Sequence, residues 1–229
     1  MSAAASGLRP APLNPEQHLL GRALPAAVFA LLLSVEVQQF AVRLHRHLSL
    51  TRIVGNSLYL VFIALFVALT LLRPPARAID RRLLPWLATT VGTFGLVVSP
   101  LFLTWSGPRL FALGKLGGGV EALLAMVSIV GALVSLTALG TAFSLIPQAR
   151  HLVVRGPYRI VRHPMYFFEG LAMLGAMLSA GTVAAIAITA LVLAAQVVRI
   201  QFEENLLRSV FPDYDEQFAG VAHVLPGLY

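Results

Sequence analysis

Long apolar runs are the sequence feature that most restricts the fold of this chain. Four of them, at residues 24–41, 53–72, 84–103 and 120–142, are each close to the roughly 20 residues that a helix needs to cross a bilayer. Two shorter runs follow at residues 165–179 and 182–198, on either side of Ala180 and Gly181. Because backbone polar groups in lipid must be satisfied within their own segment, the runs should be helical. The sequence therefore predicts an all-α, polytopic integral membrane protein with about six membrane helices, the last two forming a C-terminal helical hairpin.

Composition agrees with this reading. Hydrophobic residues make up 58% of the 229 positions and charged residues only 12%, against roughly 25% charged residues in soluble domains. The formal charge of +7 does not predict a nucleic-acid partner, because the basic residues lie in short loops between apolar runs. If the N-terminus is inside, cytoplasmic segments hold twelve of the 17 Lys and Arg residues and the other side five. This asymmetry predicts that both termini lie in the cytoplasm.

The chain divides into two regions rather than two independent domains. Residues 1–142 form a membrane region of four helices with little polar content, and residues 143–229 form a region with the hairpin, a cytoplasmic tail and most of the unusual polar residues. A short interfacial helix is expected to begin at Asn14 and Pro15, an N-cap followed by a proline at the first helical position.

Isolated polar residues in the first region receive mainly structural interpretations. Glu36 lies near the end of the first apolar run, close to Arg43, where it can be solvated or paired; a functional role for this membrane carboxylate stays open. Glu121 is expected to open the fourth helix and to complement its dipole. His45 and His47 have no partner at metal-ligand spacing and are interpreted as surface residues, so no metal site is predicted. The chain has no cysteine, which excludes disulfides and thiolate chemistry.

A polar segment precedes the hairpin. Gly156 and Pro157 mark a turn, and His163 stands before Pro164, which suits the first turn of a helix. His163 should therefore lie at the mouth of the hairpin, beside helix N-terminal amides that favour polar or anionic groups. Tyr166 and Glu169 are one turn apart on that helix and should face the same way.

A polar stripe ends the second arm of the hairpin, at Gln196, Arg199 and Glu203. The two arms of a hairpin return to the same membrane face, so this stripe and His163 should converge. The arrangement indicates either a functional site or an interfacial belt of salt bridges. Glu204 and Arg208 are four residues apart in the favourable order and are interpreted as a surface pair.

These motifs resemble a known family. Gly156-Pro157-Tyr158, Arg162-His163-Pro164-Met165-Tyr166 and Arg199-Ile200-Gln201-Phe202-Glu203-Glu204, closing with Tyr214 and Pro226-Gly227, are in this order similar to the isoprenylcysteine carboxyl methyltransferase family. Phospholipid methyltransferases are related to it and share the paired glutamates. The resemblance covers residues 139–229 and implies S-adenosylmethionine as cofactor.

Carried over position by position, the resemblance implies a pocket at the cytoplasmic face. The implied catalytic residues are Arg199, His163 and Tyr166, and the implied substrate-binding residues are Arg199 and Glu169. The implied cofactor-binding residues are Gln148, Arg150, His151, Leu152, Val153, Tyr158, His163, Pro164, Met165, Tyr166, Glu203 and Glu204.

The chemistry is compatible with these roles. Glu203 can pair with the cofactor's ammonium group, and Arg199 can hold a substrate carboxylate bidentately. The expected reaction is methyl transfer to a lipophilic small-molecule or prenylated acceptor embedded in the membrane lipids. O-methylation of a carboxylate such as a prenylcysteine or an isoprenoid acid is the simplest form, because it needs no base. A phospholipid amine or a thiol would need deprotonation, with His163 or Tyr166 as candidate bases. An NADPH-dependent reductase of the sterol-reductase type and a non-catalytic transporter are the alternatives from other classes.

Overall fold

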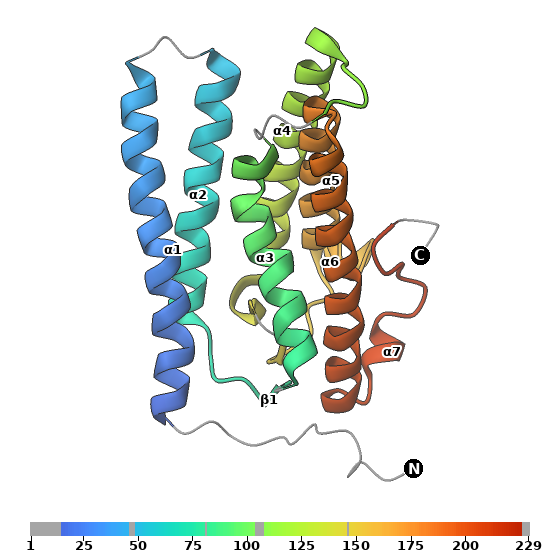
Figure 1. The fold of residues 1–229 in the computed structure, drawn as a ribbon. Coiled ribbons are helices and arrows are strands. Elements are labelled where there is room, and N and C mark those ends of the chain that lie inside the picture. Colours follow the sequence, from blue (N-terminus) through green and yellow to red (C-terminus); the bar gives the residue numbers. More distant parts are fainter. Residues whose placement is uncertain (1–14, 46–48, 81, 104–107, 146, 226–229) are drawn as a thin grey trace.

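The computed structural model describes residues 15–45, 49–80, 82–103, 108–145 and 147–225, with side chains from residue 22 onward except at 94–103. Six long helices form the body of the molecule, as Figure 1 shows. They are α1 (Pro15–Leu44), α2 (Leu50–Leu72), α3 (Leu83–Leu103), α4 (Gly114–Leu139), α5 (Pro164–Ala180) and α6 (Val183–Val210). Short elements join them: the strands β1 (Ala78–Ile79) and β2 (Gln148–Ala149), the 3₁₀ turns η2 (Gly140–Ala142) and η3 (Gly156–Arg159), and the helix α7 (Tyr214–Gln217).

Each predicted apolar run forms one of the six long helices, which confirms the all-α membrane fold. Within the described parts of the chain, four spans are long and apolar enough to cross a bilayer: residues 22–44 of α1, all of α2, α4 continued through η2, and α6. The 17 residues of α5 rise only about 26 Å, and the end of α3 has no described side chains. Six crossings therefore stay a prediction, whereas the integral membrane character is established.

Two expectations for the first region are corrected. The helix that begins at Pro15 continues through Pro25 to Leu44, so a separate short interfacial helix is wrong; Asn14 lies outside the described residues. The fourth helix begins at Gly114, which places Glu121 beyond the first turn, where the helix dipole no longer stabilises a carboxylate. Glu36 is half-buried and His45 exposed; His47 lies outside the described residues.

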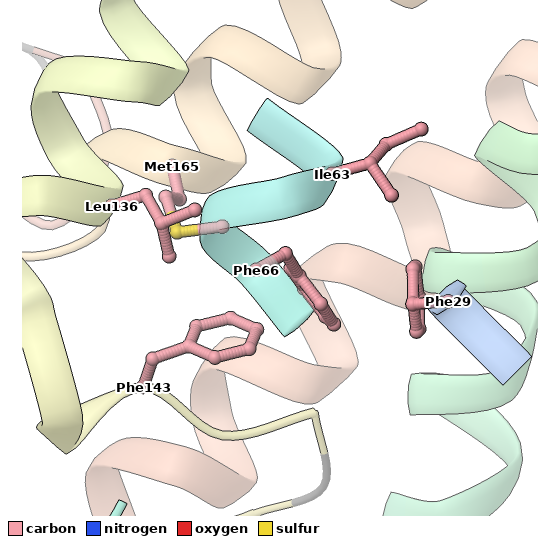
Figure 2. Close-up of a cluster of buried hydrophobic side chains, with 6 residues drawn as sticks. All are labelled: Phe29, Ile63, Phe66, Leu136, Phe143 and Met165. Atoms are coloured by element: carbon pink, nitrogen blue, oxygen red, sulfur yellow. The ribbon is translucent and has the colours of Figure 1, made fainter. Parts of the chain in front are cut away.

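Aromatic packing joins the α1–α2 pair to the other helices. In the cluster drawn in Figure 2, Phe66 of α2 lies between Phe29 of α1 and Phe143, which follows η2. The ring centroids are 4.1 Å apart for Phe29 and Phe66 and 4.5 Å apart for Phe66 and Phe143. Leu136 of α4 and Met165 of α5 belong to the same buried cluster. This cluster lies near the end of the bundle where α5 begins, termed the His163 end below.

Residues 180–182 make the turn of the hairpin. Gly181 has φ +61°, and a Cβ placed on it would lie 2.1 Å from the carbonyl oxygen of Phe111, so only glycine fits both the left-handed backbone and the close approach. Thr182 then caps α6, its Oγ1 accepting a hydrogen bond from the Ala185 amide at 3.1 Å. Each arm of the hairpin packs mainly on a helix outside the hairpin, α5 on α4 and α6 on α3.

The His163 end is closed by segments from outside the hairpin. Ala78 and Ile79 pair antiparallel with Ala149 and Gln148, which anchors the loop after η2 to the α2–α3 connection. From the other side, residues 211–225 return against the start of α5, and the amides of Arg162 and His163 donate to the carbonyls of Ala222 and His223 at 2.8 and 3.0 Å. Below, residues 211–225 are termed the C-terminal segment.

Candidate functional site

A polar cavity lies at the His163 end, between the start of α5, the second half of α6, residues 139–153 and the C-terminal segment. Twelve of the residues implied from the sequence line it, namely Gln148, Arg150, His151, Leu152, Val153, Tyr158, His163, Met165, Tyr166, Glu169, Arg199 and Glu203. Pro164 and Glu204 do not line it. The predicted convergence of the two arms of the hairpin is therefore confirmed.

Tyr166 holds the two arms together at this cavity. Its hydroxyl donates to Glu203 Oε2 at 2.6 Å, and its ring stacks on His163 with centroids 5.5 Å apart. Glu203 Oε1 accepts no hydrogen bond among the described residues. One carboxylate oxygen on the cavity wall is therefore held in place and the other is left for a ligand.

Glu204 serves a different purpose from Glu203. Its side chain is 4% exposed, and Oε1 accepts from His163 Nε2 at 3.1 Å and His223 Nδ1 at 2.6 Å. Oε2 accepts from Arg208 at 2.8 Å and lies 3.7 Å from Arg162. The expected pair with Arg208 exists, but it is not a surface pair, because Glu204 is buried. Glu204 lies behind the cavity wall, where it orients His163 and attaches the C-terminal segment.

Arg199 is buried; Nη1 and Nη2 donate hydrogen bonds, whereas Nε has no partner among the described residues. Nη2 donates to the carbonyls of Leu145 and Ser144 at 2.8 and 3.4 Å, and Nη1 donates to Thr93 Oγ1 at 3.3 Å. The guanidinium also lies 4.7 Å from the centre of the Tyr166 ring. In this geometry Arg199 shapes the loop at residues 144–145 and places a positive charge beside the cavity.

Arg150 and Gln148 fix the opposite wall. Arg150 donates from Nε to the Pro74 carbonyl at 2.9 Å and from Nη2 to Gln148 Oε1 at 2.5 Å. Burial, with the positive charges of Arg73 and Arg22, lowers the pKa of Arg150 to about 9. Such a poorly solvated cation favours an anion nearby. Partial desolvation and neighbouring arginines likewise lower the pKa of His151.

Glu169 lies deeper in the bundle, toward the centre of α5. Its Oε2 accepts from Gln196 Nε2 at 2.5 Å, which confirms that the polar stripe of α6 faces α5. Its Oε1 accepts no hydrogen bond among the described residues. One oxygen of Glu169 is therefore hydrogen-bonded to α6, and the other has no partner among the described residues.

An apolar cavity opens on the other side of Glu169, between α2, α4 and α5. The volume of this cavity is about 470 Å³, against about 90 Å³ for the polar cavity. It follows α2 from Arg52 to Phe66, a distance of about 21 Å at 1.5 Å per residue. Phe66, Thr93 and Glu169 line both cavities, and their meeting point is termed the junction.

Several residues of the site were not predicted from the sequence. Phe66 and Thr93 come from the first region, in which no motif is recognisable, and they complete the junction. Thr93 is one of three threonines of α3, with Thr89 and Thr90, so its sequence context does not single it out. Phe218 of the C-terminal segment also lines the polar cavity. Among the described residues, no group of three His, Cys, Asp or Glu side chains is placed to hold a metal ion.

The model of a family described as phospholipid methyltransferase matches residues 112–214, somewhat less than half of the chain. The C-terminal half is similar to membrane methyltransferases. The match runs from α4 to α7 and so includes both arms of the hairpin and most of the polar cavity.

A curated relative matches a shorter stretch. The nickel-cobalt-cadmium resistance protein NccN of Alcaligenes xylosoxydans xylosoxydans is 41% identical over 71 residues, which make up 30% of this chain and 33% of the relative. The match thus spans about a third of that protein's length, and its activity as a whole does not transfer to this chain.

Proposed function

We propose that this protein is a membrane methyltransferase that binds S-adenosylmethionine in the polar cavity and methylates a lipophilic acceptor held in the apolar cavity. The observation that carries the proposal is the junction, where a polar cavity built from the family motifs meets a membrane-embedded apolar cavity. A water-soluble cofactor can reach the junction from the aqueous side, and a lipophilic acceptor can reach it from the membrane. By the charge asymmetry of its loops, the polar cavity faces the cytoplasm.

The lining of the polar cavity fits the cofactor. Glu203 Oε1 is available for the ammonium group, and a carboxylate is the strongest neutral-pH partner for it. The positive surroundings of Arg150 suit the cofactor's carboxylate, and Leu152, Val153 and Tyr158 offer apolar and aromatic surface for the adenine. When bound, the cofactor supplies an activated methyl group on a sulfonium.

The protein's own contribution is to bring the reacting groups together. Proximity and orientation can supply about 7–11 kcal/mol toward such a displacement. The Tyr166–Glu203 hydrogen bond and the Glu204–His163 contact fix the polar wall, and the Gln196–Glu169 hydrogen bond fixes the junction. All of these groups lie on α5 and α6, two helices joined by a turn that only glycine fits.

The lining of the apolar cavity supports an acceptor with a single long apolar chain. Its walls are mainly Phe, Leu, Ile, Met and Ala side chains, and a chain lying along α2 would place its reactive end at the junction. A prenylated carboxylate, the acceptor expected from the isoprenylcysteine resemblance, and a lipid amine both satisfy this shape.

The test uses the full chain purified in detergent or in phosphatidylcholine nanodiscs. Calorimetry with S-adenosylmethionine is expected to show binding that Glu203→Ala weakens at least tenfold, whereas Glu216→Ala, on the exposed side of α7, leaves it unchanged. Incubation with methyl-labelled cofactor and a lipid extract is then expected to label a lipid-soluble product. Equal binding of the cofactor by wild type and Glu203→Ala, or binding of NADPH instead, would overturn the proposal.

A further inference from the structure

Three polar side chains line the apolar cavity away from the junction. Asn56 and Tyr59 of α2 are three residues apart and both line the cavity, and Ser128 of α4 lines it from another wall. Ser128 is 4% exposed, and its Oγ has no hydrogen-bond partner among the described residues. Neither the Asn56 amide nor the Tyr59 hydroxyl forms a hydrogen bond within the described parts of the chain. These three residues are termed the Asn56 site below.

The residues of the Asn56 site lie at a similar depth in the membrane. A Cβ on Gly55 would lie 3.8 Å from Met126 Cε, and Phe66 and Leu136 belong to the buried cluster of Figure 2. Helices α2 and α4 therefore run in the same direction, with facing residues about 70 positions apart in sequence. This offset places Ser128 between the two polar residues of α2 in depth.

The Asn56 site lies between the junction and the far end of the cavity. Asn56 precedes Phe66, the α2 residue at the junction, by ten residues, or about 15 Å along the helix. Glu169, the α5 residue at the junction, follows Phe168, whose ring lies against Gly131 of α4. By the same offset Glu169 is level with about residue 60 of α2, or about 6 Å from Asn56 along the helix axis. The middle of a long chain that ends at the junction would therefore pass the Asn56 site.

Polar groups without partners are costly at this depth. An amide or hydroxyl that leaves water without gaining a hydrogen bond loses free energy, and polar side chains inside membrane spans commonly mark the path of a ligand. The remaining lining of α4 near this depth is apolar, namely Ala125, Met126 and Ile129. A ligand that carries an oxygen atom at this level would satisfy groups that the protein itself leaves unpaired.

The polar residues at the far end of the cavity have a simpler explanation. Thr51 and Arg52 lie in the first turn of α2 and are exposed, so solvent or lipid head groups can satisfy them. Asn56 is half-buried and is the seventh residue of the helix, about 9 Å beyond its first residue. The need for a partner inside the cavity therefore belongs to the Asn56 site and not to the cavity mouth.

We propose that the Asn56 site binds an oxygen atom in the chain of the acceptor, so that the acceptor is an oxygenated lipid rather than a plain hydrocarbon chain. This inference rests on the proposed function and names the substrate class of that same site; it leaves the reacting group open. A hydroxyl, carbonyl or ether oxygen suits the site, because the amide of Asn56 offers a donor and an acceptor and a hydroxyl can act as either. Asn56, Tyr59 and Ser128 determine specificity and do not touch the reacting atoms.

Water is the competing occupant of the Asn56 site. A cavity with two to four polar partners can hold an ordered water molecule, which would satisfy the same groups. A plain chain would then pass beside the water, and an oxygen atom in the chain would bring no advantage. The two occupants therefore differ in whether the protein discriminates between oxygenated and plain chains.

The test measures binding to the full chain in phosphatidylcholine nanodiscs without cofactor. The probes are hexadecanoic acid and hexadecylamine, each plain, with a hydroxyl on carbon 8, or with a hydroxyl on carbon 16. Each probe competes with its radiolabelled plain form, and the measured quantity is the affinity of the hydroxylated chain divided by that of the plain chain. Comparing this ratio between proteins cancels the different partition of the probes into lipid.

The variants remove one polar group each. They are Asn56→Leu, Tyr59→Phe and Ser128→Ala, and the matched control is Ser57→Ala, an exposed position on α2 that lines neither cavity. For a head group that binds, the carbon-8 ratio of the wild type and of Ser57→Ala should exceed that of Asn56→Leu about tenfold, the size of one or two buried hydrogen bonds. Ser128→Ala and Tyr59→Phe should each lower this ratio about threefold.

Two further expectations separate recognition from loss of structure. Asn56→Leu should bind the plain chain at least as well as the wild type does, which a misfolded variant could not do. The carbon-16 ratio should be the same in all five proteins, because a hydroxyl at the end of the chain lies beyond the Asn56 site. A carbon-8 ratio that Asn56→Leu leaves unchanged, or an equal fall at carbons 8 and 16, would overturn the inference.

Failure of every probe to bind the wild type would also overturn the inference. The proposed function is tested separately, because failure of the wild type to bind S-adenosylmethionine would overturn it whatever the probe ratios are. Cofactor binding together with equal ratios in wild type and Asn56→Leu would instead leave a methyltransferase whose Asn56 site holds water alone.

Discussion

Replacing Glu204 with alanine should detach the C-terminal segment and destabilise the site. Four groups converge on this buried carboxylate: His163 at 3.1 Å, His223 at 2.6 Å, Arg208 at 2.8 Å and Arg162 at 3.7 Å. Arg162 and His163 immediately precede α5, Arg208 lies on α6 and His223 lies in the C-terminal segment. The substitution therefore removes the point at which three segments are joined.

The expected size of the effect follows from what each partner keeps. Breaking a buried ion pair by removing one member costs about 3–5 kcal/mol, because the other charge stays buried without compensation. Arg208 keeps Asp215 at 2.9 Å, and Arg162 keeps the carbonyls of Val221 and Phe218, so neither arginine is left alone. The cost should lie at the low end, about 3 kcal/mol.

The assay is reversible unfolding in mixed detergent and denaturing surfactant, with limited proteolysis after residue 210 as a local probe. Asp215→Asn is the matched control: Asp215 is 71% exposed in its pair with Arg208, and such a surface pair contributes about 0–1 kcal/mol. The Glu204→Ala variant should be cleaved much faster than this control. A loss below about 1 kcal/mol, with no change in cleavage, would refute the view that Glu204 attaches the segment.

Three further predictions concern packing, the apolar cavity and pH. Gly131→Ala should destabilise the bundle by about 1–3 kcal/mol, measured by the same unfolding assay, because its Cβ would lie 2.2 Å from an aromatic ring on α5, whereas Gly118→Ala, with nothing within 4 Å, should be neutral. Gly55→Trp should fill the part of the apolar cavity that is remote from the junction and lower kcat/KM for a sixteen-carbon acceptor at least tenfold more than for an eight-carbon one; equal losses would contradict the placement of the chain. Burial acts to raise the pKa of Asp80, but hydrogen bonds from an adjacent arginine outweigh it and lower that pKa. A lowered folded-state pKa adds stability above the unfolded value of about 3.9 that disappears as the pH falls through the folded-state value, so unfolding curves should show Asp80→Asn less stable than wild type at pH 7 and nearly equal to it at pH 2.

The fold could be predicted from the sequence because a lipid environment permits few backbone conformations besides the helix. Run length and the absence of charge are sufficient to locate a membrane helix, and all six helices were located. The ends of the helices were predicted less well. Helix α6 continues to Val210, well past its apolar run, because Arg199, Glu203 and Glu204 contact partners inside the protein. A hydropathy pattern cannot show that a charged residue will be satisfied by a segment distant in sequence.

The site was predicted where its residues lie on one hairpin and missed where they do not. The meeting of Tyr166 with Glu203 follows from two helices that return to the same face. Thr93 enters only because α3 packs on α6, and the sequence contains no signal for the neighbours of membrane helices. The roles of adjacent residues also differed: Glu203 faces the cavity and Glu204 faces away, since consecutive residues on a helix point about 100° apart.

The junction has a consequence for the order of events during turnover. The polar cavity reaches solvent beside the exposed His151, and the apolar cavity runs toward the opposite end of α2, so each reactant has its own route. Under the proposed function, the used cofactor can leave through the polar cavity while the acceptor chain stays in the apolar cavity. An enzyme with this layout is suited to add more than one group to the same molecule during a single encounter, and partially modified products would then be scarce at early times.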